Sequence, residues 1–148
     1  MKHLPALAFG LAAALQAVAT AQAAPAPLSL VHGWSRPAVA GTNAVGYLTV
    51  VNHGGKADAV VAVTSPLAAR VDMHSMAMTG GVMAMQPASR VAVPAGGQAV
   101  FGPGGYHLML MGVSRTLKVG DKVPVSIAFA GGAKLKTDLT VALAPPSS

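Results

Sequence analysis

The sequence of 148 residues contains no cysteine. Without a thiol, the chain has no disulfide scaffold, no cysteine nucleophile, no iron–sulfur cluster and no cysteine-based zinc finger. Blue copper sites and thiolate-bridged dinuclear copper sites also need cysteine ligands, so both kinds of site are excluded. Any soft metal ligand in this protein must therefore be something other than a thiolate.

Acidic side chains are scarce as well. The chain has 4 of them, all aspartate, against 10 Lys and Arg, and only 9% of its residues are charged. A glycosidase with paired carboxylates and a calcium cage are both disfavoured by this count. The basic residues are scattered and no run of them is interleaved with aromatics, so we expect solubility and a mild preference for acidic partners, not nucleic acid binding.

The first 23 residues have the features of a secretory signal peptide. A basic start, Met1-Lys2-His3, precedes an apolar stretch over Leu4–Val18, and Ala21-Gln22-Ala23 is a small-residue cleavage site. The apolar run is shorter than the roughly 20 residues of a spanning helix, and no later run is longer. We therefore predict cleavage after Ala23, export to an oxidising compartment, most simply a bacterial periplasm, and no membrane span in the mature chain.

The mature chain is predicted to form one β domain. Residues 24–28 read as a Pro/Ala linker, 29–143 as the domain and 144–148 as a flexible tail. Ten short runs, spaced about ten residues apart and separated by Gly, Pro, Asn and Ser, predict an all-β sandwich or barrel. The runs are Ser29–Ser35, Ala44–Asn52, Ala57–Ser65, Arg70–Met78, Val82–Gln86, Arg90–Val93, Gln98–Phe101, His107–Met111, Lys122–Ala130 and Lys134–Leu143.

Three runs show which residues supply the core. The run Tyr47–Val51 is apolar on both faces, as expected of a central strand, and the other two carry large apolar residues at alternate positions. The alternating sets are Val123, Val125, Ile127 and Phe129 in one run, and Leu135, Leu139, Val141 and Leu143 in the last.

Methionine and histidine are concentrated in one window. All seven mature methionines lie between positions 73 and 111: Met73, Met76, Met78, Met83, Met85, Met109 and Met111. Since residues two apart in a strand share a face, His74 projects with Met76 and Met78, and His107 projects with Met109 and Met111. Thioether sulfur suits Cu(I), and imidazole also binds copper.

Each of these residues also has a purely structural interpretation. Methionine often fills irregular gaps in a core, and we assign Met73 and Met83 to that role. We expect His32 and His53 to be exposed or hydrogen-bonded side chains without a special function. Met76, Met78 and Met111 are expected to form an apolar rim that shields a metal, with a role as transient ligands left open.

The spacing of four of these residues matches a known motif. The sequence resembles the periplasmic copper chaperones called PCu(A)C, whose motif is His, ten residues, Met, twenty-one residues, His, one residue and Met. This motif is matched without a gap by His74, Met85, His107 and Met109. By chance this fixed spacing would arise with a probability of ~0.0004, raised several-fold by methionine clustering. The segment Pro103–Gly112 looks similar to the family as well, and the resemblance covers roughly residues 30–142.

The resemblance implies a cupredoxin-like Greek-key β-barrel in a single domain. It implies a non-enzymatic Cu(I) carrier whose ligands are His74, Met85, His107 and Met109. Its partners would be copper acceptors such as cytochrome c oxidase subunit II, with its dinuclear copper site, or Sco-type proteins, and we expect a monomer. Some family members have a Met/His-rich C-terminal extension associated with Cu(II), which this sequence lacks.

Three other functions compete with delivery by a chaperone. Copper sequestration for tolerance would need the same ligands but no dedicated acceptor. A copper oxygenase that binds metal through a mature N-terminal histidine is disfavoured because the predicted mature chain begins at Ala24, and electron-transfer centres normally need the missing cysteine. A metal-free β-sandwich interaction module would leave the spacing of histidine and methionine without a purpose.

Overall fold

The computed structural model describes residues 27–147, so the predicted signal peptide, most of the linker and Ser148 lie outside the described residues. Every run that the sequence predicts to be a strand is one, and the ends agree to within two residues. The strands are β1 Leu28–Ser35, β2 Ala44–Asn52, β3 Asp58–Thr64, β4 Ala68–Thr79, β5 Val82–Pro87, β6 Val91–Val93, β7 Gln98–Phe101, β8 His107–Val113, β9 Lys122–Phe129 and β10 Lys134–Val141. No helix in this part of the chain is long and apolar enough to cross a membrane.

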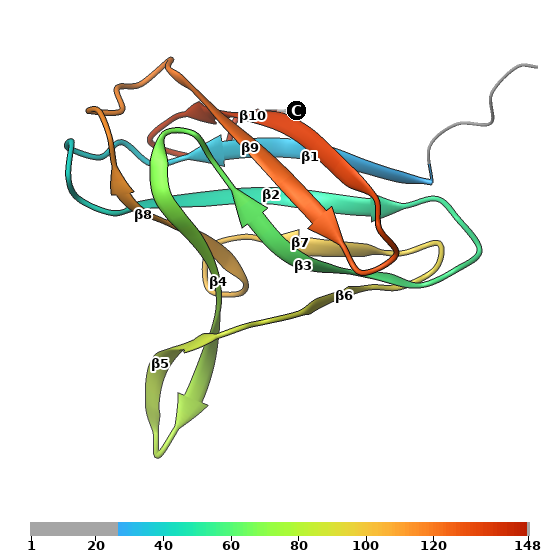
Figure 1. Cartoon of the computed structure of the whole chain (residues 1–148). Helices are drawn as coiled ribbons and strands as arrows, with labels where there is room; N and C mark the ends of the chain where they lie inside the picture. The colour runs from blue at the N-terminus through green and yellow to red at the C-terminus, as the bar shows by residue number, and fades with distance from the viewer. Residues whose placement is uncertain (1–26, 148) are drawn as a thin grey trace, which may run out of the picture.

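Seven of the strands close into a barrel (Figure 1). Their order is β4-β8-β2-β1-β10-β9-β3, and the pairing of Val63 in β3 with Val71 in β4 completes the ring. β1 and β10 run parallel, whereas the other paired strands are antiparallel. The predicted all-β barrel is thus confirmed.

The barrel interior is filled by the alternating apolar residues of its strands. β2 pairs with β1, β7 and β8, which confirms its central place, and Leu48 and Val50 are fully buried. In β9 the predicted apolar face is buried throughout, and in β8 the two leucines point into the core. These residues are Val123, Val125, Ile127 and Phe129 of β9 and Leu108 and Leu110 of β8.

The last strand ends earlier than predicted, at Val141. The amide of Ala142 still donates a hydrogen bond to Ser35, but Leu143 is 76% exposed, so its assignment to the core is wrong. Pro145 and Pro146 follow closely, and because proline has no N–H the ladder does not continue through them. The rest of that apolar face packs as predicted: Leu139 and Val141 are buried and Leu135 is partly buried.

The second half of β4 leaves the barrel and forms a hairpin with β5, which projects away from the barrel body (Figure 1). The two strands are joined by Gly80 and Gly81, whose φ angles are 58° and 81°. Two consecutive residues with positive φ make a type I′ turn, which glycine adopts without strain and which matches the twist of a hairpin. This two-residue turn places Thr79 opposite Val82 and so sets the register of the whole hairpin.

Candidate metal centre

His74 lies where β4 passes from the barrel into the hairpin. On one side it pairs with His107 of β8, and on the other it pairs with Pro87 of β5. Two residues before His74, Asp72 is opposite Met109 of β8. Two residues after His74, Met76 is opposite Met85 of β5. Directly opposite residues of an antiparallel pair project from the same face, so all four predicted ligands share one face of β5, β4 and β8, around His74.

The two imidazoles are neighbours. Their ring centroids are 5.7 Å apart and the rings are inclined at 76°. His107 is only 6% exposed, and its Nδ1 lies 3.1 Å from the carbonyl oxygen of Gly105. A carbonyl oxygen only accepts, so Nδ1 carries the proton of this hydrogen bond. In the neutral ring, Nε2 then has the free lone pair that a metal needs, and the ring orientation is held by the main chain.

His74 has a buried ring nitrogen without a partner. Its Nδ1 is inaccessible to solvent and has no hydrogen bond within the described residues. A buried polar atom left in this condition costs about 1–3 kcal/mol, so such atoms are rare in proteins and need a physical reason. A metal ion bound at this Nδ1 would supply one, and the imidazole and thioethers on the same face fit a soft metal.

The two thioethers differ in exposure. Met109 is half-buried in β8, whereas Met85 is 57% exposed in the edge strand β5. Within residues 27–147, no three His, Asp or Glu side chains are grouped so as to hold a metal ion. Besides the two imidazoles, the face of His74 presents the carboxylate of Asp72 and the thioethers of Met85 and Met109.

Sequence analysis missed a charged pair beside the four residues. Arg70 donates through Nε to Oδ2 of Asp72 at 2.9 Å, and these two residues are opposite Met111 and Met109 respectively. The signal was present in the sequence, since Asp72 is two residues before His74 and so shares its face. The carboxylate offsets part of the positive charge of a bound cation, and Arg70 offsets part of the carboxylate.

The structural roles predicted for other methionines and histidines are only partly confirmed. Met73 faces the interior and is 7% exposed, as predicted. Met83, however, is 49% exposed and opposite Met78 at the end of the hairpin, so its assignment to core packing is wrong. The hairpin carries it beyond the barrel, where there is no core to fill.

Two other histidines of the described residues, His32 and His53, lie outside this face, as expected. His32 is exposed and has a φ of 55°, at the point where the register of β1 and β2 shifts. His53 is exposed in the loop after β2 and makes a hydrogen bond of 3.1 Å with the hydroxyl of Ser29. Neither imidazole belongs to the face around His74.

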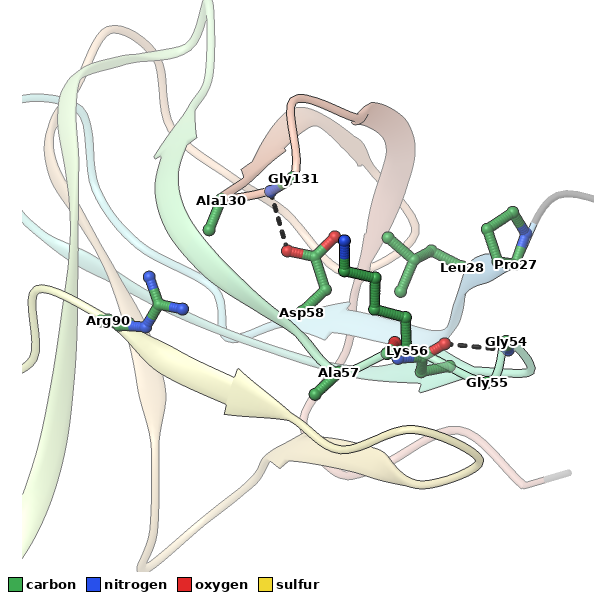
Figure 2. Close-up of a pocket in the computed structure, with 11 residues that line it drawn as sticks. Pro27, Leu28, Gly54, Gly55, Lys56, Ala57, Asp58, Arg90, Ala130 and Gly131 are labelled. Atoms are coloured by element: carbon green, nitrogen blue, oxygen red, sulfur yellow. Dashed lines mark hydrogen bonds between the residues drawn. The ribbon is translucent and has the colours of Figure 1, made fainter.

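A separate cavity of about 530 Å³ lies at the loops that follow β2 and β9 (Figure 2). Asp58, Lys56 and Arg90 line it, but the carboxylate of Asp58 already accepts hydrogen bonds from the amides of Ala59 and Gly131. No imidazole or thioether is among the lining residues. This cavity therefore offers no donors of the kind found around His74.

Solved structures share this fold. The copper-bound PCuAC domain of PmoF2 is 23% identical to this chain and superposes with a TM-score of 0.65, over 80% of this chain and 95% of that domain. The solution structure of Cu(I)-DR1885 from Deinococcus radiodurans is 28% identical, with a TM-score of 0.58, and covers 83% of this chain and 82% of that one. These likenesses confirm the predicted cupredoxin-like fold.

Relatives in sequence include a protein described as "Putative lipoprotein Lxx21020" from Leifsonia xyli subsp. xyli. It is 35% identical over 100 residues, which are 67% of this chain. The match spans only 60% of that relative's own length. The family model described as "Putative lipoprotein LpqE-like" matches residues 28–141, from the first strand to the last. This chain is therefore a member of the LpqE-like family.

Proposed function

We propose that this protein is a PCuAC-type copper chaperone that binds Cu(I) through His74, Met85, His107 and Met109. The observation that carries the proposal is the buried, unpartnered Nδ1 of His74, next to a second imidazole whose free nitrogen is set by Gly105. The match of these four residues to the PCu(A)C motif and the copper-bound state of two structural relatives support it.

The chemistry of these donors favours Cu(I). Two imidazoles and two thioethers are all neutral, so the bound centre carries a single positive charge, which the neighbouring Asp72 partly offsets. Thioether sulfur favours Cu(I) over Cu(II) and is a poor ligand for Zn(II), which prefers imidazole, thiolate or carboxylate. Unlike thiols, thioethers do not form disulfides, so this donor set suits an oxidising compartment.

The difference in exposure between the donors indicates how copper leaves. His107 is buried and Met85 is 57% exposed at the edge of the sheet, so Met85 is the donor that an incoming ligand replaces first. A thiolate or imidazole of the acceptor would then enter as Met85 departs, and the remaining protein ligands would follow in turn. Copper stays Cu(I) throughout, so the transfer needs no electron donor or acceptor.

The acceptor and the compartment follow from the same proposal. The acceptor is the dinuclear copper site of cytochrome c oxidase subunit II, reached directly or through a Sco-type protein. The predicted signal peptide and the lipoprotein relatives support an exported protein, which we place in the periplasm. The chain acts as a monomeric carrier and not as an enzyme.

Sequestration without an acceptor is the second candidate. It uses the same centre, and the exposure of Met85 is what favours delivery over storage, because a storage site gains from burying all its donors. Mixing the Cu(I)-loaded protein with an apo acceptor separates the two. Transfer of copper at equilibrium supports delivery, and retention by this protein supports sequestration.

Cu(I) titration against a competing chelator, under anaerobic reducing conditions, tests the binding proposal. Removing a group that only hydrogen-bonds to a metal ligand typically weakens metal binding by about 10–100-fold. Met85→Leu/Met109→Leu removes two ligands themselves, so we expect Cu(I) binding to weaken by more than this. Met111→Leu is the matched control, because it removes a thioether opposite Arg70, farther from His74. Unchanged affinity in the double variant, or an X-ray absorption spectrum with only nitrogen and oxygen neighbours, would contradict the proposal.

A further inference from the structure

Three of the thioethers beyond the proposed centre lie together on the hairpin of β4 and β5. The type I′ turn at Gly80 and Gly81 places Met78 opposite Met83, and Met76 lies two residues before Met78 on the same strand. Because opposite residues share a face and alternate residues of a strand share a face, all three side chains project together. Directly opposite side chains have Cβ atoms about 5 Å apart, a distance that flexible methionines span when they bind one ion.

These methionines do not serve as core residues. Met78 is 65% exposed and Met83 is 49% exposed, at the end of a hairpin that projects from the barrel (Figure 1). Val82, next to the turn, is 65% exposed as well. Exposing several large apolar side chains in one place has a cost in solubility, which indicates that the patch has a use.

We propose that Met76, Met78 and Met83 form a second Cu(I) site, made of thioethers alone. Three neutral sulfur donors match the preference of Cu(I) for soft ligands, and nothing in the set attracts Zn(II) or Cu(II). The site shares no ligand with the centre around His74, so it does not rest on the function proposed above.

The position of this site gives it a purpose in loading the protein. Met78 is four residues from His74, which corresponds to roughly 13 Å along a strand. The pair formed by Met76 and Met85 lies between them on the same face. Cu(I) captured at the exposed end of the hairpin therefore passes from Met78 and Met83 to Met76 and Met85, and then to His74, by exchange of one ligand at a time.

The number of Cu(I) ions bound per protein tests the inference, measured by anaerobic titration and native mass spectrometry of the purified mature chain. We expect two ions in the wild type, one in Met78→Leu/Met83→Leu, and one in Met109→Leu, where the hairpin site persists. Met73→Leu is the control, since it removes a thioether from the opposite, buried face and should keep two ions. Leucine preserves side-chain volume, so these variants are expected to fold.

A single Cu(I) ion in the wild type that is kept in Met78→Leu/Met83→Leu, or two ions in that variant, would overturn the second site and leave the centre around His74 untouched. A second ion that is lost in Met109→Leu but kept in Met78→Leu/Met83→Leu would overturn it as well. Labelled methionine methyl groups give an independent readout. The resonances that Met78→Leu/Met83→Leu removes should be the ones that shift when the second equivalent of Cu(I) binds.

Discussion

The main chain holds His107 in the form that the proposed copper centre requires. The hydrogen bond of its Nδ1 to Gly105 selects the tautomer, and burial restricts the ring, so little reorganisation is left for the binding step. His74, with its unpartnered Nδ1, has no such restraint on that nitrogen. The two imidazoles are thus expected to contribute differently, with His107 as the fixed ligand.

Replacing His107 is expected to weaken Cu(I) binding. His107→Gln removes the ring nitrogen that would bind the metal. The affinity for Cu(I) should fall by at least about 10-fold, because removing even a group that only hydrogen-bonds to a metal ligand usually costs that much. Competition with a Cu(I) chelator measures the change. His53→Gln is the control, because His53 is exposed and bonded to Ser29, and equal losses in both variants would argue against a specific role for His107.

Asp121 provides a pH-dependent contribution to stability at the level of one residue. The carboxylate of Asp121 accepts hydrogen bonds from the backbone N–H of Lys118 and from the guanidinium of Arg115. Both hydrogen bonds lower the pKa of Asp121 below its ordinary value. A carboxyl group whose pKa is lower in the folded state stabilises the fold at pH values above its unfolded pKa of about 3.9, and this stabilisation is lost as the pH falls through the folded pKa.

Asp121→Asn should therefore be less stable than the wild type at pH 7, and this difference should shrink as the pH is lowered toward 3. Urea unfolding at several pH values measures the free energy of unfolding of both proteins. A difference that stays constant across the pH range would show that the charge of Asp121 does not stabilise the fold.

The hairpin of β4 and β5 is the element that extends the face around His74 beyond the barrel. Its turn sets the register, which puts Met85 opposite Met76, diagonally across from His74, and Met83 opposite Met78. Among the strands of residues 27–147, β5 pairs only with β4, and it is exposed along most of its length. The turn therefore has more influence on this register than packing has.

Gly81→Ala tests the role of the turn. Alanine at a φ of 81° costs about 1–2 kcal/mol, because its Cβ approaches the following carbonyl oxygen. We expect faster amide hydrogen exchange in β5 and weaker Cu(I) binding, while the barrel strands keep their protection. Gly55→Ala is the control, since an added Cβ there meets nothing within 4 Å. Equal protection of β5 in Gly81→Ala and the wild type would contradict this role.

At the scale of the whole molecule, the closed barrel holds β4 and β8 side by side and thereby brings His74 to His107. Because the residues of β8 alternate, Leu108 and Leu110 lie in the core while the proposed ligands His107 and Met109 lie on the other face. The stability of the barrel and the geometry of the centre therefore depend on the same strand.

Leu110→Ala should destabilise the protein by about 2–5 kcal/mol, the usual cost of a cavity left by a buried leucine. Leu143→Ala, at a position that is 76% exposed, should change the free energy of unfolding by no more than about 0.5 kcal/mol. Urea unfolding followed by circular dichroism measures both. A large effect at Leu143 would mean that it packs against the barrel after all.

The sequence alone determined the features that depend on neighbouring residues. Residues typical of turns and alternating apolar residues located all ten strands. The spacing of His74, Met85, His107 and Met109 selected the candidate ligands before any strand was paired. Period-two alternation also predicted correctly that Met73 faces the core.

Only the tertiary structure decided which strands became neighbours. His74 and His107 are far apart in sequence, and nothing in the local pattern of either run says that β4 pairs with β8. The same pairing placed Asp72 opposite Met109, and the departure of the hairpin from the barrel left Met83 in solvent. The alternation of residues along a strand shows which face of that strand each side chain occupies. Which other strand lies beside it depends on how the whole chain closes around its core.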